Sequence, residues 1–180
     1  MKKILFATLM VAMLICGSLS AETLLTEAQA LKIVFPKSQT VERDTKSLTG
    51  EQRQKLQQST RLRFPEQQYT FYVAKSKGQI DGHALVLDEI GKHENITFIV
   101  GVSPKGEVLE VAVMEYRESR GGEVKEQRFL RQFHGKKQAD EIAVNKDIMN
   151  YTGATLSSHA IARGVKRALA LVDTFYGTSK

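Results

Sequence analysis

The sequence predicts an α+β fold, an antiparallel sheet of about four or more strands flanked by N-terminal helices and a long C-terminal helix. Between Tyr69 and Tyr116 the apolar residues recur with the period of two that is typical of strands. On both sides of this region they recur with the wider spacing of amphipathic helices. Because helices, strands and helices follow one another in blocks, the pattern favours α+β over an alternating α/β fold.

The first residues predict an export signal. Lys2 and Lys3 precede an uncharged apolar stretch from Ile4 to Cys16, and small residues follow it up to Ala21. This stretch is shorter than the roughly 20 residues that a membrane-spanning helix needs. We therefore expect residues 1–20 to be a signal peptide and the protein to be exported, to the periplasm or the outer face of the cytoplasmic membrane. An uncleaved signal that anchors the chain is the alternative.

The cysteine and histidine content of the chain limits which kinds of functional site it can form. Cys16 is the only cysteine and lies in the expected signal, so the exported chain has no thiol for disulfides, nucleophilic catalysis or metal binding. The four histidines share no metal-ligand spacing, and no carboxylate pair or nucleophile elbow stands out. We therefore predict neither a metal site nor catalytic residues.

The net charge of the chain is +6, and Lys2 and Lys3 of the signal contribute to it. Basic and acidic residues are interleaved rather than gathered in a stripe, so we expect no nucleic-acid binding. The mild basic excess suits an anionic membrane surface or an acidic protein partner.

Two capping sequences predict helices in the N-terminal segment, residues 21–68, which we expect to pack on the same domain. Thr26-Glu27-Ala28-Gln29 opens a short helix that ends at Pro36. Thr49-Gly50-Glu51-Gln52 opens a polar helix that ends near Thr60. The polar stretch between them, Lys37 to Ser47, predicts a loop.

The strands and the last helices fall in residues 69–180, the expected main domain. Turn sequences at Lys77-Gly78 and from Ser103 to Gly106 separate strands and indicate hairpins. The predicted strands are Tyr69 to Ala74, His83 to Ile90, Asn95 to Val102, and Val108 to Tyr116.

Two helices are predicted after the strands. The apolar residues Val124, Phe129, Leu130 and Phe133 recur at roughly helical spacing, and Gly135 can end that helix. The final helix runs from about Leu156 to Tyr176, with apolar residues on one face.

The run from Tyr151 to Ser158 has the most unusual local composition, because hydroxyl side chains crowd directly before the last helix. The free amides and the positive dipole end of a helix N-terminus stabilise a phosphate group. Gly153 and Ala154 are small and allow a ligand to approach the backbone. The alternative is that Ser and Thr serve only as the N-cap of this helix.

The sequence Thr152-Gly153-Ala154-Thr155-Leu156-Ser157 resembles the [ST]-G-A-T-x-[ST] signature of the FMN-binding domain family. This family is found in the flavin-carrying subunits of Rnf-type electron-transport complexes and of sodium-translocating NADH:quinone oxidoreductases. Further blocks follow the order expected in that domain: Ile96 to Gly101, Gly106 to Tyr116, Glu118 to Gly121, and Phe129 to Lys136.

The resemblance implies an FMN joined to Thr155 through a phosphoester, made by a separate flavin transferase with FAD as donor. Residues around it would contact the cofactor: Thr152, Gly153, Ala154, Leu156, Ser157 and Ser158. The resemblance places Glu118 and Ser119 in a loop beside the flavin ring, where related subunits usually have Glu-Thr-Pro-Gly and this chain has Arg120 for the proline.

Other residues have two interpretations. Glu118 lies by the ring or forms a solvated hairpin end. Lys136 neutralises the phosphate or is a surface lysine. Phe129 and Phe133 form an apolar surface beside the flavin ring or, as we favour, belong to the hydrophobic core.

The family has an Asp three residues before its [ST]-G-A-T run, and here the chain departs. Met149 stands at that position, and Asp147 lies two residues further upstream. Either Asp147 supplies the carboxylate that the transferase recognises, or attachment is inefficient or absent.

These observations predict an exported electron carrier that relays electrons to or from a membrane-bound redox partner, with the membrane contacted peripherally or through an uncleaved signal. A stand-alone enzyme is less expected. The alternatives are a flavin-dependent periplasmic reductase of a small substrate, and an exported module that binds a phosphorylated ligand without redox chemistry.

Overall fold

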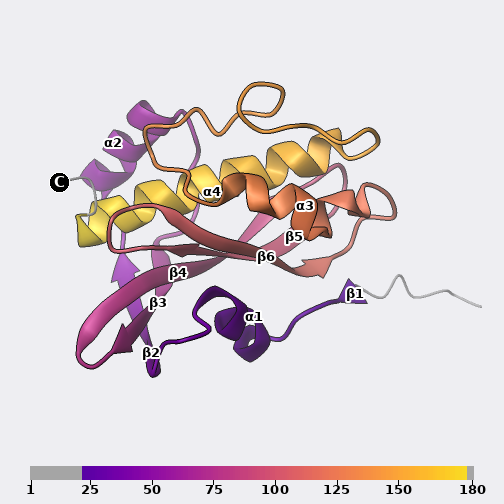
Figure 1. Ribbon diagram of the computed structural model, residues 1–180. Helices are drawn as coiled ribbons and strands as arrows, with labels where there is room; N and C mark the ends of the chain where they lie inside the picture. The colour runs from indigo at the N-terminus through magenta and orange to yellow at the C-terminus, as the bar shows by residue number, and fades with distance from the viewer. Residues whose placement is uncertain (1–21, 178–180) are drawn as a thin grey trace, which may run out of the picture.

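The computed structural model describes residues 22–177 of the chain (Figure 1). The expected signal peptide, residues 1–20, lies outside the described residues. The division at residue 68 stays a prediction, and strands on its two sides pair in one sheet.

The described residues form one six-stranded antiparallel sheet in the order β1-β6-β5-β4-β3-β2 (Figure 1). Its centre is a meander in which consecutive strands pair with one another, as the hairpin turns predicted. The strands are β1 Glu22–Thr23, β2 Thr40–Ser47, β3 Gln68–Ser76, β4 Gln79–Ile90, β5 Asn95–Val102 and β6 Val108–Tyr116. The four predicted strands are therefore confirmed, with β3 and β4 somewhat longer than expected.

The first two helices begin with the capping boxes that the sequence predicted. In α1 (Glu27–Val34) the Thr26 hydroxyl accepts from the amide of Gln29, whose side chain accepts from the Thr26 amide. The α2 helix (Gly50–Thr60) repeats this arrangement with Thr49 and Gln52. The long last helix, α4, spans Thr155–Tyr176, close to the predicted range.

Two corrections concern the segments between these elements. The stretch from Lys37 to Ser47 was expected to be a loop, but its larger part is the edge strand β2, paired with β3 over its whole length. Most β2 residues are exposed, so the strand is held by backbone hydrogen bonds and shows no apolar face in the sequence. The N-terminal segment is therefore not purely helical.

The helix expected around Val124 to Phe133 is broken into three short turns: η1 Gly122–Lys125, α3 Gln127–Leu130 and η2 Arg131–Phe133. Glu126 between the first two has extended backbone, with ψ of 140°, which interrupts the helix. The helical spacing of the apolar residues survives because each turn directs one or two of them into the core.

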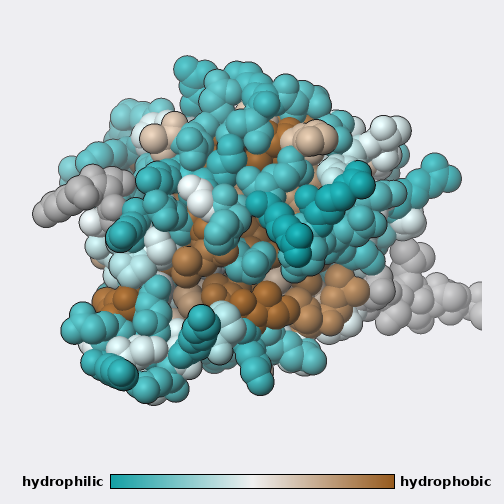
Figure 2. Space-filling view, viewed as in Figure 1, coloured by the Kyte–Doolittle hydropathy of each residue, from teal (hydrophilic) through white to brown (hydrophobic). Residues whose placement is uncertain are grey.

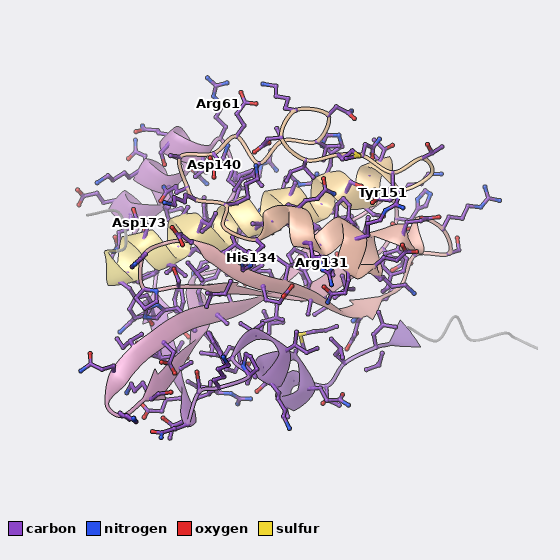
Figure 3. All side chains as sticks on the ribbon, viewed as in Figure 1. Arg61, Arg131, His134, Asp140, Tyr151 and Asp173 are labelled. Atoms are coloured by element: carbon purple, nitrogen blue, oxygen red, sulfur yellow. The ribbon has the colours of Figure 1, made fainter. Side chains whose placement is uncertain are left out.

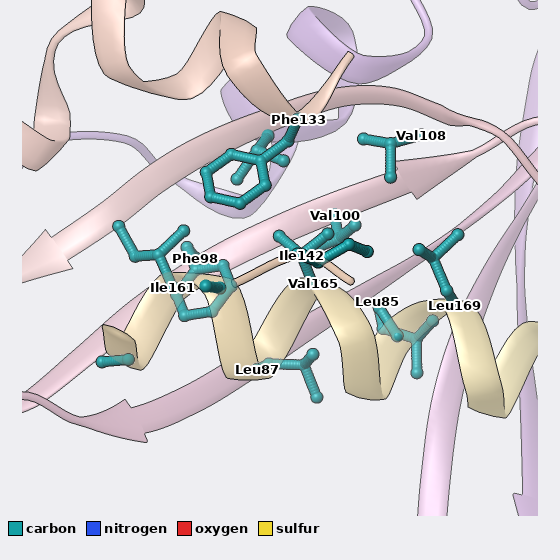
Figure 4. Packing of buried hydrophobic residues seen from close by; sticks show 14 of the residues in the cluster. Leu85, Leu87, Phe98, Val100, Val108, Phe133, Ile142, Ile161, Val165 and Leu169 are labelled. Carbon is teal, nitrogen blue, oxygen red and sulfur yellow. The ribbon is translucent and has the colours of Figure 1, made fainter. Parts of the chain in front are cut away.

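The α4 helix covers one face of the sheet, together with α2 and α3, and builds the larger core (Figures 1 and 4). In Figure 4, Ile161, Val165 and Leu169 of α4 face apolar residues of the strands. Gly164 allows this close approach, because a Cβ there would lie 2.3 Å from the Phe98 ring.

The α1 helix covers the opposite face and builds a smaller core against strands β3 to β6. A Cβ on Gly101 would lie 2.0 Å from Val34 Cγ1 of α1, so only glycine allows this contact. In Figure 2 the apolar residues on the visible face gather in a band at the level of the sheet and α1, beneath polar loops.

Residues 134–154 form a long connection between η2 and α4, and this connection passes over α4 (Figure 1). Buried Ile142, Val144 and Ile148 anchor it to the larger core. Figure 3 shows Tyr151, near the end of this connection, beside the first turns of α4.

Within residues 22–177, no helix combines the length and the apolar character that crossing a bilayer requires. In the same residues, no three His, Cys, Asp or Glu side chains gather in a way that could hold a metal ion.

Candidate functional site

The first turn of α4 has no side-chain cap. Its N-cap residue is Ala154, and within residues 22–177 no side chain accepts a hydrogen bond from the first-turn amides. The interpretation that the nearby Ser and Thr residues only cap this helix is therefore wrong. The longest helix of the described residues presents free amides at Thr155, Leu156 and Ser157, where the positive end of its dipole lies.

A cavity of about 530 Å³ lies against this helix end. Three segments line it: the β4–β5 turn, the loop after β6, and the start of α4. Its lining residues are Lys92, His93, Glu118, Ser119, Arg120, Gly153, Thr155, Leu156 and Ser157. The structure thus brings together most of the residues that the sequence selected.

Lys92, His93 and Arg120 were not selected from the sequence, and they give the cavity its basic wall. The β4–β5 turn comes beside the loop after β6 because β5 and β6 pair antiparallel, with Ile96 opposite Tyr116. The predicted strands located the turn between Ile90 and Asn95, but only the pairing register shows that it lies beside the loop after β6.

Glu118 is a clamp between the loop after β6 and the β4–β5 turn. Its Oε1 accepts hydrogen bonds from the amides of Lys92, of His93 at 2.6 Å and of Glu94 at 3.1 Å. A Cβ on Gly91 would lie 2.8 Å from this oxygen, so glycine leaves room for the clamp.

The clamp also changes the charge balance of the cavity. Burial acts to raise the pKa of Glu118, but the three amide donors outweigh it and hold this pKa below its ordinary value. The carboxylate therefore stays ionised, and its charge is directed at the turn amides. Lys92 and Arg120 are the two cationic side chains that line the cavity.

Tyr116 ties the loop after β6 to α4. Its hydroxyl donates to the carbonyl oxygen of Arg120 at 2.6 Å and lies 3.2 Å from Ser157 Oγ. Gly121 has φ of +82°, and a Cβ there would lie 3.2 Å from Ala154 Cα. Burial raises the pKa of the Tyr116 hydroxyl, which stays protonated and able to donate.

Thr155 is the first residue of α4, and its side chain is exposed in the cavity. The side-chain amide of Asn150 donates to Thr155 Oγ1 at 2.9 Å. The backbone at Gly153 has φ of +87°, a conformation that favours glycine. Thr152 is exposed on the same turn, whereas the Ser158 hydroxyl is buried and does not line the cavity.

Lys136 and Asp147 lie outside the cavity lining and pair with each other at 2.8 Å. Asp147 also accepts from the amides of Ile142 at 3.1 Å and Ala143 at 2.7 Å. Burial acts to raise the pKa of Asp147, but these amides and Lys136 lower it. Both residues thus brace the connection between β6 and α4.

Phe129 and Phe133 are fully buried, with ring centroids 5.6 Å apart in an edge-to-face arrangement. The Phe129 ring also contacts the Tyr151 ring at 5.8 Å. The preferred interpretation of both residues as core is confirmed (Figure 4 shows Phe133 above the strands).

A phosphate fits this site. Free amides at a helix N-terminus and two cations are the groups that bind phosphate in proteins. The cavity volume of about 530 Å³ falls in the range of roughly 300–1,000 Å³ that ligand sites occupy. Leu156, half exposed, adds an apolar surface beside the polar wall.

Residues 91–170 match the FMN-binding domain family. This part of the chain is similar to that domain family. The matched range begins at the β4–β5 turn and ends inside α4, so it contains every lining residue of the cavity. The expected family and its cofactor, FMN, are therefore confirmed.

Two curated relatives are G-type components of redox complexes. The chain is 31% identical over 115 residues to that component of the proton-translocating ferredoxin:NAD(+) oxidoreductase complex of Clostridium ljungdahlii, covering 59% of this chain and 62% of the relative. It is 33% identical over 113 residues to that component of the ion-translocating oxidoreductase complex of Haemophilus influenzae (strain PittEE), covering 56% and 55%. The matches thus span little more than half the length of these relatives.

The fold resembles the crystal structure of Shewanella oneidensis NqrC. The TM-score is 0.58 at 15% sequence identity, and the match covers 81% of this chain and 86% of that one. At this identity the likeness concerns the fold.

Proposed function

We propose that this protein is an exported electron-transfer subunit that carries FMN covalently, through a phosphoester on Thr155. The observation that carries the proposal is the uncapped start of α4, which presents the Thr155 hydroxyl and free amides to a basic cavity within the FMN-binding domain. When bound, the flavin supplies one- and two-electron redox chemistry.

Different residues of the chain would hold the phosphate and the ring of the cofactor. The amides of Thr155, Leu156 and Ser157 would donate hydrogen bonds to the phosphate oxygens, with Lys92 and Arg120 neutralising the phosphate charge. The loop at Glu118 and Ser119, together with Leu156, lines the remaining space, where a flavin ring would lie. No residue of this set is needed as a catalyst.

Attachment requires an outside enzyme. Thr155 Oγ forms a bond to the phosphorus of the FMN half of FAD, and the bond from that phosphorus to AMP breaks. The hydroxyl proton goes to a base of the flavin transferase, AMP leaves with the bonding electrons, and no group is oxidised or reduced. The side chain of Thr155 is exposed, so the transferase can reach it.

A covalent bond is suited to an exported protein. Outside the cytoplasm free flavin is dilute, so a cofactor held only by reversible contacts would be lost by mass action. A phosphoester prevents this loss. The predicted signal at residues 1–20 and the attachment chemistry thus support each other.

The names of the relatives, which are subunits of proton- or ion-translocating oxidoreductase complexes, support a membrane-bound redox partner. The described residues contain no helix that could span a bilayer, so the proposed contact is peripheral or through an uncleaved signal.

The test is co-expression of the full chain with a flavin transferase, followed by denaturing electrophoresis under ultraviolet light and mass spectrometry. We expect a fluorescent band, a mass increase of FMN less water, and loss of residues 1–20. Thr155→Val should abolish the fluorescence, and Thr40→Val, which removes an exposed hydroxyl on β2, should not.

The same preparation separates the alternatives. Bare polypeptide mass in protein made beside a competent transferase refutes covalent attachment. A yellow protein that turns over soluble acceptors without any partner protein would favour the small-substrate reductase. A colourless protein that binds a phosphorylated ligand would favour the non-redox module.

A further inference from the structure

We infer that Asn150 is a positioning residue that orients the Thr155 hydroxyl for attachment of the cofactor, and that Gln132 holds Asn150 in place. This inference rests on the proposed function, since it assigns a role toward the phosphoester. Asn150 lies in the connection before α4 and does not line the cavity.

The contact between the two side chains is direct. Asn150 Nδ2 donates to Thr155 Oγ1 at 2.9 Å. Thr155 Oγ1 does not cap its own helix, so the rotamer of this exposed side chain is not fixed by the backbone. The hydrogen bond from Asn150 selects one orientation of the oxygen.

Stability alone does not explain where Asn150 lies. Its Oδ1 is buried and has no hydrogen-bond partner among the described residues, which is an unfavourable state for an amide oxygen. A buried polar atom left unpartnered calls for a functional reason. Directing the NH₂ group at Thr155 provides one.

Gln132 fixes the backbone just before Asn150. Its Oε1 accepts from the amide of Met149 at 2.6 Å, and its Nε2 lies 3.4 Å from the Met149 carbonyl oxygen. The Gln132 amide thus bonds to both the N–H and the C=O of Met149, as the backbone of a neighbouring β-strand does. The Met149 side chain is 70% exposed, so the backbone is the part that is held.

An amide NH₂ group suits both states of Thr155. It donates to the lone pairs of a free hydroxyl, whose own proton remains available to the transferase. It can equally donate to an ester oxygen, which has no proton and can only accept. A carboxylate at position 150 could not donate, and it would repel a phosphate.

Asp147 cannot replace Asn150 in this role. Both of its carboxylate oxygens are already bonded, Oδ1 to the amide of Ala143 and Oδ2 to the amide of Ile142 and to Lys136. If the flavin transferase recognises Asp147, this residue would act in attachment without contacting the Thr155 hydroxyl.

The test measures attachment in vitro with purified mature-length protein, purified flavin transferase and excess FAD, following the mass increase with time. In Asn150→Leu we expect the attachment rate to fall about tenfold, the loss of roughly 1.4 kcal/mol in orienting the oxygen. Gln132→Leu should also slow attachment. Gln58→Leu removes an exposed amide on α2 and should leave the rate unchanged.

Two further measurements separate positioning from folding. The ³¹P resonance of the attached phosphate should shift in Asn150→Leu and not in Gln58→Leu, because only the former changes a donor beside the ester. Asn150→Asp keeps the size of the side chain and removes the donor, so it should slow attachment even if the leucine variant does not fold.

The outcomes are distinct. A wild type that gains no mass overturns the proposed function, and this inference with it. A wild type that gains FMN beside Asn150→Leu and Asn150→Asp variants with wild-type rates and ³¹P shifts overturns the role of Asn150 alone.

Discussion

Replacing Glu118 by alanine should loosen the β4–β5 turn and weaken the cavity at the same time. The change removes the carboxylate oxygen that accepts from the amides of Lys92, His93 and Glu94. Two of these residues line the cavity, so their backbone loses the contact that holds them beside α4.

The magnitude follows from the number and exposure of these bonds. A hydrogen bond to a charged group contributes about 1.5–3 kcal/mol where it is shielded. The turn is open to solvent and its freed amides can bond to water, so the three bonds together should contribute only about 1–2 kcal/mol to the free energy of unfolding. Glu118→Gln keeps an acceptor oxygen without the charge and should lose about half of this.

Urea unfolding between pH 7 and pH 3.5 measures this effect. The pKa of Glu118 in the folded protein lies below its ordinary value of 4.5, so the unfolded chain binds the proton more readily. The stabilisation is therefore complete above pH 4.5 and is lost as the pH falls through the folded pKa. The difference between wild type and Glu118→Gln should shrink in that acidic range.

Binding gives the second measurement. In a Thr155→Val background, where FMN can bind only reversibly, we expect Glu118→Ala to weaken FMN binding about five- to tenfold, or roughly 1–1.4 kcal/mol. If Glu118→Ala unfolds at the wild-type urea concentration and binds FMN equally well, Glu118 does not position the turn.

Three further variants test the packing. Gly101→Ala should destabilise the protein by about 1–3 kcal/mol in urea unfolding, because its Cβ would lie 2.0 Å from Val34 Cγ1; an unchanged midpoint would contradict the packing of α1. Phe129→Ala should cost about 3–5 kcal/mol, whereas a changed flavin spectrum at full stability would place this ring at the cofactor. His83 is buried and stacks on Tyr176, with ring centroids 3.9 Å apart, and burial lowers its pKa in the folded protein. Its contribution to the free energy of unfolding is therefore complete above the unfolded pKa of about 6.5. As the pH falls from there to the folded pKa, this contribution declines by at most about 1.4 kcal/mol per pH unit. His83→Phe should remove this component, and equal acid sensitivity of both proteins would refute it.

Local patterns in the chain predicted most of the elements. Alternating apolar residues located the four central strands, and the capping sequences at Thr26 and Thr49 located the starts of α1 and α2. These signals are local because strand periodicity and capping each depend on residues a few positions apart.

The edge strand β2 escaped prediction for a physical reason. An edge strand exposed on both faces has no apolar side to place in a core, so its composition resembles that of a loop. Its pairing with β3 depends on backbone groups that every residue carries.

The candidate site likewise has one part that the sequence predicted and another that only the structure located. The sequence by itself predicted the family, its cofactor FMN and the candidate threonine, because the signature before α4 and the ordered blocks between Ile96 and Lys136 can both be recognised in the chain. The structure decided that the start of α4 has no side-chain cap. Only the tertiary structure decided that Lys92 and Arg120 share a cavity with Thr155, that Glu118 clamps a turn, and that Asn150 contacts the hydroxyl. Strand register and the path of a long connection bring these groups together, and neither leaves a periodic signal in the chain.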